Sequence, residues 1–111
     1  MADESVVTAV RQYLKALQEG GLPVRFGVVF GSQVAGRAER WSDIDLVVVS
    51  PRFDGKVSRR DVDLLWRLAA RLDSRIEPIP CGERQWRDGN SSIIIDVARR
   101  EGETILPSEA A

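Results

Sequence analysis

A largely polar segment, residues 31–45, follows one apolar run and includes the start of a second, and it constrains the fold of this chain more than any other feature. The first run, residues 24–30, ends directly at the glycine that opens the segment. The second run, residues 43–49, consists largely of β-branched residues and ends just before Pro51, as is typical of a strand. The sequence therefore predicts two strands joined by a tight turn and a short connection.

Two aspartates, Asp43 and Asp45, open the second strand. Successive side chains of a strand point to opposite faces of the sheet, so these two carboxylates point the same way. Like charges held that close repel each other unless a cation lies between them. Mg²⁺ suits the arrangement, because it is a hard ion that is often held by one or two carboxylates together with substrate phosphates.

The turn before them, Gly31-Ser32, is suited to a phosphate. A short helix over residues 32–38 would offer unpaired backbone N–H groups at its start. Gly31 lets the backbone approach a ligand closely, and Ser32 adds a hydroxyl donor. Gly36 is predicted to end or bend this helix.

The combined string Gly-Ser-x3-Gly-x5-Ser-Asp-Ile-Asp-Leu resembles the signature of the DNA polymerase β-like nucleotidyltransferase superfamily. The resemblance is strong over residues 26–77 and weak in the flanks. With 111 residues, the chain is most similar to the minimal nucleotidyltransferase branch, whose members are often encoded beside a HEPN-domain protein.

The resemblance implies the chemistry of the site. It implies transfer of a nucleoside monophosphate, with ATP or another nucleoside triphosphate as substrate and two Mg²⁺ ions as cofactors. The metal-binding and catalytic residues would be Asp43, Asp45 and Glu77. The nucleotide-binding residues would be Gly31, Ser32, Gly36, Arg37 and Ser42.

Glu77 is assigned through the third carboxylate that family members carry on a neighbouring strand. It lies in a short apolar run, and its other interpretation is a solvated strand residue. Pro78 follows directly and cannot donate to a sheet ladder, so we expect an edge strand or a strand that ends there.

One position departs from the family pattern. Relatives commonly carry arginine just before the second glycine, where this chain has Ala35. Arg37 lies two residues later and either replaces that arginine or faces solvent. Trp41 and Trp86 either border the nucleotide or pack in a core or a partner interface.

Composition limits the alternatives. The chain is 43% hydrophobic and 30% charged, which indicates a globular protein without a membrane segment. We expect one domain over residues 1–111, with a core of about residues 5–106. The single cysteine, Cys81, agrees with a cytoplasmic location. The absence of histidine excludes imidazole acid–base catalysis, and a net charge of −1 argues against nucleic acid as the main partner.

The order of predicted elements gives the fold class. The residues opening the polar segment follow one strand, whereas the aspartates open the next, so both reach one site only if the two strands are antiparallel. We therefore expect an α/β (α+β) domain with a small mixed sheet and helices mainly on one face. The predicted helices are 5–19, 32–38, 58–72, 82–88 and 92–100, and the predicted strands are 24–30, 43–49, 74–80 and 103–106.

Three functions remain open. The first is AMP transfer to a hydroxyl of a partner protein, as the antitoxin of a HEPN-type toxin–antitoxin pair. The second is nucleotidyl transfer to a small molecule, resembling the aminoglycoside-modifying enzymes, by a homodimer. The third is a partner-binding module that keeps the metal site but has little turnover.

Overall fold

The computed structural model describes residues 2–36, 38–39, 41–89 and 92–107. Four strands form one sheet: β1 (Phe26–Phe30), β2 (Ile44–Ser50), β3 (Ile76–Gly82) and β4 (Glu103–Ile105). The helices are α1 (Glu4–Glu19), α2 (Ser32–Ala35), the 3-10 turn η1 (Pro51–Phe53), α3 (Arg59–Leu72), α4 (Glu83–Asp88) and α5 (Ile93–Glu101). No helix within these described residues is long and apolar enough to cross a membrane.

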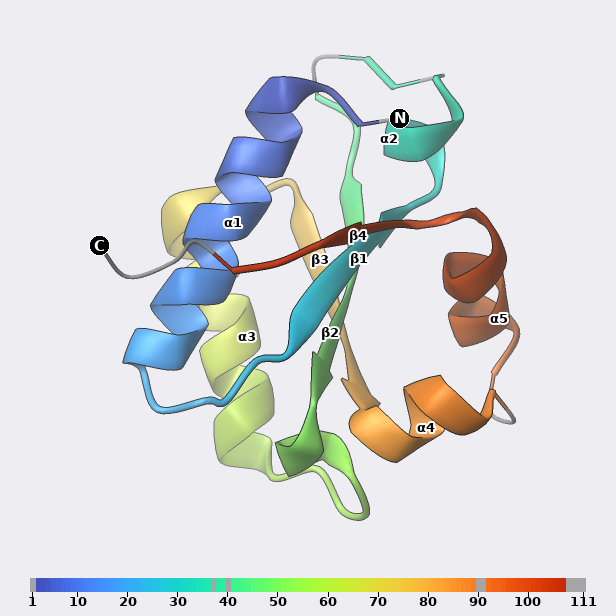
Figure 1. Cartoon of the computed structure of the whole chain (residues 1–111). Helices are drawn as coiled ribbons and strands as arrows, with labels where there is room; N and C mark the ends of the chain where they lie inside the picture. Colours follow the sequence, from blue (N-terminus) through green and yellow to red (C-terminus); the bar gives the residue numbers. More distant parts are fainter. Residues whose placement is uncertain (1, 37, 40, 90–91, 108–111) are drawn as a thin grey trace.

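The sheet is mixed, with the strand order β3-β2-β1-β4. Strand β1 pairs antiparallel with both β2 and β4, whereas β2 and β3 run parallel. The predicted antiparallel arrangement of the first two strands is confirmed. As Figure 1 shows, the end of β1 and the beginnings of β2 and β3 therefore lie at the same end of the sheet, beside α2.

The two longest helices, α1 and α3, cover one face of the sheet (Figure 1). Their apolar stripes pack against alternate strand residues such as Leu46, which is completely buried. The Tyr13 hydroxyl donates to the Leu65 carbonyl at 2.8 Å and so links the two helices. Helix α1 begins at Glu4, one residue earlier than predicted, and Asp3 is its N-cap residue.

The other face carries the shorter helices. Ile95 and Ala98 of α5 pack against Val47 and Val49 of β2, in a second apolar cluster. Trp86 of α4 belongs to this layer: its ring meets Phe26 edge-on, with 5.8 Å between centroids. These contacts favour the packing role of Trp86 over stacking on a nucleotide base.

Strand β3 is an edge strand, as the prolines predicted, but it does not end at Pro78. It continues to Gly82 because it pairs with β2 on one side only, so a proline N is tolerated where it faces away from the partner strand. The side chain of Cys81 is fully buried in this strand, and desolvation raises the pKa of its thiol to about 11, which makes it unreactive.

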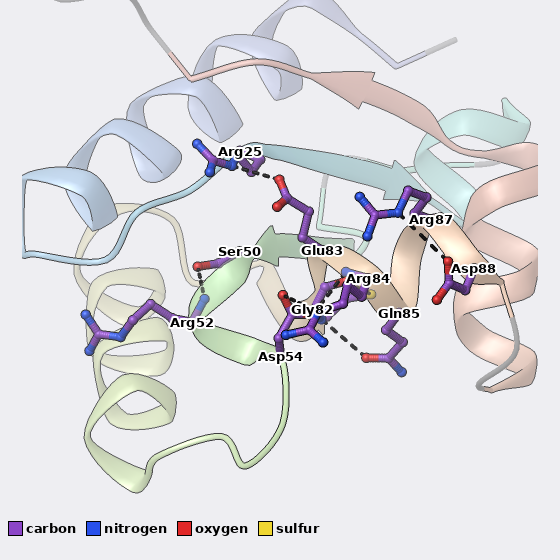
Figure 2. Close-up of polar contacts among 11 residues, drawn as sticks. Arg25, Ser50, Arg52, Asp54, Gly82, Glu83, Arg84, Gln85, Arg87 and Asp88 are labelled. Atoms are coloured by element: carbon purple, nitrogen blue, oxygen red, sulfur yellow. Dashed lines mark hydrogen bonds and ion pairs between the residues drawn. The ribbon is translucent and has the colours of Figure 1, made fainter.

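The end of the sheet opposite α2 is closed by polar contacts, which Figure 2 shows. Arg25, just before β1, donates to Glu83 of α4 at 2.8 Å. Asp54, just after η1, accepts from the Arg84 backbone at 3.0 Å. These contacts tie the start of β1 and the loop after β2 to α4.

At the end of α3, Asp73 binds Arg75 through both carboxylate oxygens. Its Oδ1 accepts from the backbone N and the Nε of Arg75 at 3.0 Å each, and its Oδ2 accepts from Nη2 at 2.8 Å. The hydrogen bond from the Arg75 side chain lowers the pKa of Asp73. The Arg75 carbonyl in turn accepts from Ile44 N at 2.8 Å, so this turn also fixes where β2 begins beside β3.

We expect Asp73→Asn to lower the free energy of unfolding by about 1 kcal/mol near neutral pH, because it removes a charge-assisted hydrogen bond. A lowered folded-state pKa adds stability above the ordinary aspartate pKa of 3.8, and this stability disappears as the pH falls through the folded-state value. The difference between wild type and variant should therefore shrink in acid. Urea unfolding over a pH series measures it.

Asp63→Asn, at an exposed position of the same helix, is the control. A stability difference for Asp73→Asn that persists unchanged in acid would contradict the role of the Asp73 carboxylate.

Candidate active site

Gly31 brings the two halves of the polar segment into contact. It follows β1 with φ of 77° and ψ of −145°, a conformation open almost only to glycine. A Cβ at this position would lie 2.6 Å from Oδ2 of Asp45. The absence of a side chain at residue 31 therefore lets the turn pack directly on that carboxylate.

Asp45 and Glu77 lie opposite each other on neighbouring parallel strands. Asp45 is also the antiparallel partner of Phe30, the last residue of β1. Both carboxylates share the sheet face of Val47 and Cys81, the face that α5 covers further along the strands. The structure thus places Glu77, the predicted third carboxylate, beside Asp45, at the end of the sheet where β1 ends.

Asp43 lies just before β2, which begins one residue later than predicted, and it is exposed. Burial and then the charge of Asp43 raise the pKa of Asp45, while a hydrogen bond with Glu77 partly opposes the rise. Desolvation, followed by the charges of Asp43 and Asp45, raises the pKa of Glu77. The three side chains therefore lie close enough to repel one another electrostatically.

The three carboxylates fit a hard divalent cation by donor chemistry and by this mutual repulsion, which a cation would relieve. They do not form a closed cage. Within the described ranges, no group of three or more His, Cys, Asp or Glu side chains has a geometry that could hold a metal ion by itself. A cation here would need further oxygen ligands, such as the phosphates of a substrate.

The turn Gly31-Ser32 continues into α2, which has only four residues and ends at Gly36, with φ of 75°. The early end of the helix at Ala35 rather than at residue 38 leaves it almost no macrodipole. Phosphate binding here would depend on the individual backbone N–H groups and on the half-buried Ser32 side chain.

Ser42 and Arg37 are the other predicted nucleotide-binding residues, and the structure describes only Ser42. The Ser42 hydroxyl accepts from the Glu39 backbone at 2.8 Å, and Ser42 N donates to the Glu39 carbonyl at 3.0 Å. Ser42 therefore shapes the loop before β2. Arg37 lies outside the described residues, so its role stays a prediction.

Two residues of the site were missed in the sequence. Gln33 is buried on α2, and its amide contacts the backbone before β2; an amide inside the motif was its only signal. Glu101, at the end of α5, lines a hollow of about 320 Å³ together with Gly31, Val34 and Ala35. Nothing in the sequence links a residue so far along the chain to this turn.

Gly31→Ala should destabilise the protein by about 1–3 kcal/mol, because alanine is strained in this backbone conformation and its Cβ collides with Asp45. The matched control is Gly55→Ala: Gly55 also has positive φ, at 81°, but a Cβ there meets nothing within 4 Å. Denaturant unfolding should show a smaller loss for the control. Equal losses for the two variants would mean that Gly31 does not pack on the carboxylate.

Asp45→Asn should stabilise the protein in EDTA by up to about 1 kcal/mol, since it removes one of the repelling charges. Mg²⁺ should raise the melting temperature of the wild type and not that of the variant. Asp63→Asn, at an exposed position of α3 beyond its first turn, should change neither value. A variant less stable than the wild type in EDTA would show that the carboxylates do not repel one another.

Two solved structures share this fold. A protein from Sulfolobus solfataricus, provisionally named a nucleotidyltransferase, superposes with a TM-score of 0.63 at 15% identity, over 90% of this chain and 78% of its own. A chain from a toxin–antitoxin structure with AMP-PNP superposes with a TM-score of 0.58 at 20% identity, over 89% and 74%. These likenesses confirm the expected fold.

Among curated protein sequences, none shows a significant match. The family profile described as a nucleotidyltransferase domain matches residues 10–95, which span both strands of the candidate site and Glu77. By this match over most of its length, the chain belongs to the nucleotidyltransferase domain family.

Proposed function

We propose that this protein transfers AMP from ATP to a hydroxyl group of a partner protein, with Mg²⁺ held by Asp43, Asp45 and Glu77. The observation that carries the proposal is the contact of the Gly31 backbone with the Asp45 carboxylate, beside Glu77 in the neighbouring strand. This contact joins the proposed phosphate-binding turn to a group of carboxylates at one end of the sheet. Metal-dependent phosphoryl chemistry needs this combination.

In this proposal the bound Mg²⁺ would neutralise the charge of the triphosphate and of the departing pyrophosphate. Gly31 and Ser32 bind the β and γ phosphates through backbone N–H groups and the hydroxyl. The acceptor oxygen forms a bond to the α phosphorus, and the bond from that phosphorus to the β-phosphate oxygen breaks. Glu77 takes the hydroxyl proton as the general base.

A protein is the proposed acceptor for two reasons. One structural neighbour comes from a toxin–antitoxin structure with AMP-PNP, which supports an antitoxin-like role with a protein partner. That this partner is of the HEPN type and that the pair works in the cytoplasm is part of the proposal and follows from the family resemblance. Close to the site, Trp41 has 77% of its surface exposed and borders a hollow of about 520 Å³ with Leu72, which is also exposed. Large exposed aromatic and apolar side chains are typical of protein contacts.

A second candidate is a partner-binding module with little or no turnover. The open arrangement of the three carboxylates favours it, because no three-ligand metal cage exists among the described residues. The small-molecule enzyme, acting as a homodimer, stays a prediction without an observation of its own.

Co-expression with the protein encoded next to it tests the main proposal. Intact-mass spectrometry of that protein should show the added mass of one or more AMP groups. Asp43→Asn should reduce this modification to background, because the phosphates and their cation lose a ligand. Asp63→Asn, exposed on α3, should leave it unchanged.

Modification at the wild-type level by Asp43→Asn would rule out the metal mechanism. Stable binding of the partner without any mass increase would support the binding module instead. Turnover of a soluble acceptor by the purified protein alone would support the small-molecule enzyme.

A further inference from the structure

The side chain of Gln33 connects α2 to the backbone before β2. Gln33 follows Ser32 directly and has only 5% of its surface exposed. Its Nε2 donates to the carbonyl oxygens of Ser42, at 3.1 Å, and Asp43, at 3.2 Å. A primary amide carries two N–H donors, so each carbonyl receives its own hydrogen.

The backbone that Gln33 holds lies outside regular secondary structure. Asp43 precedes β2 and so lies outside the ladder between β1 and β2. The described residues from 38 to 43 form neither helix nor strand. On the side of β3, Ile44, the residue after Asp43, is fixed by a hydrogen bond of 2.8 Å from its N to the Arg75 carbonyl. On the side of α2, the Gln33 amide holds the carbonyl of Asp43 itself.

The turn at the other end of this link is itself well defined. The Gly31 carbonyl accepts from Val34 N and Ala35 N, at 3.1 Å each, so residues 31–35 form one compact unit. A fixed Gln33 therefore fixes the phosphate-binding turn relative to Asp43. We propose that Gln33 is a positioning residue, which sets the separation between the Gly31-Ser32 turn and the Asp43 carboxylate. This inference rests on the function proposed above.

The chemistry of position 33 is selective. Glutamate would place a carboxylate against two carbonyl oxygens, in a site where three carboxylates already repel one another. Methionine would keep the length of the side chain but leave the carbonyl groups of Ser42 and Asp43 without their amide donors. Glutamine supplies both donors and adds no charge.

The test compares Gln33→Met with the wild type, using AMP-PNP as the probe. Isothermal titration measures its affinity with Mg²⁺ and in EDTA, and the ratio of the two gives the gain that depends on metal. Gln33→Met should reduce this gain about tenfold, because the turn and the carboxylates no longer meet in one geometry. The affinity in EDTA, which depends on the turn, should change less than about twofold.

Amide hydrogen exchange of the ligand-free protein provides a second readout. Exchange at Ser42 and Ile44 should be about tenfold faster in Gln33→Met, while Val28 in β1 stays protected. Gln18→Met is the matched control. This substitution removes a hydrogen bond of similar length, 3.0 Å from the Gln18 side-chain amide to the Val24 carbonyl. That hydrogen bond lies near the start of β1 and away from the site.

An equal metal-dependent gain in wild type and Gln33→Met would overturn the role of Gln33 and leave the proposed function intact. A wild type that gains no affinity from Mg²⁺ would overturn the proposed function and the role of Gln33 with it. If Gln33→Met does not fold, Gln33→Asn replaces it. Asparagine keeps the amide but is one methylene too short to reach both carbonyls, so the same loss of metal-dependent affinity is expected.

Discussion

The close approach of Gly31 to the Asp45 carboxylate is the contact on which the candidate site depends. It requires a backbone conformation that side chains other than glycine's rarely allow, and space that a Cβ would fill. It also requires β1 and β2 to be antiparallel, because only then does the end of one strand lie beside the start of the next. Local conformation and sheet topology therefore act together at a single residue.

The two ends of the sheet differ in the charges that they bring together. At the end of the sheet opposite α2, ion pairs such as that between Arg25 and Glu83 tie the loops to α4 (Figure 2). At the end of the sheet beside α2, the carboxylates of Asp43, Asp45 and Glu77 lie near one another. Their repulsion raises the pKa of Asp45 and of Glu77 in addition to the effect of burial. Such repulsion costs stability in the ligand-free protein and is relieved by a bound cation, as is common where a site is built for a ligand.

Much of the fold follows from local pattern. The starts of α3 and α5, each capped by a serine side chain, follow from short stretches of sequence. The predicted end of α2 at Gly36 does so as well, and the structure confirms it. The boundaries were less predictable. The N-cap residue of α1 is Asp3. Strand β3 continues past Pro78 because its pairing with β2, and not local preference, decides how far it extends.

The sequence by itself determined which residues are proposed to carry the chemistry. The spacing of the motif and the alternation of a strand predicted Asp43 and Asp45 on one face, after a turn that glycine suits, although β2 itself begins at Ile44. Tertiary structure alone decided what surrounds them. The parallel register sets Glu77 opposite Asp45, and folding brings in Gln33 and Glu101. These relations depend on how distant segments pack, and no local pattern encodes a distance between segments that meet only in the folded chain.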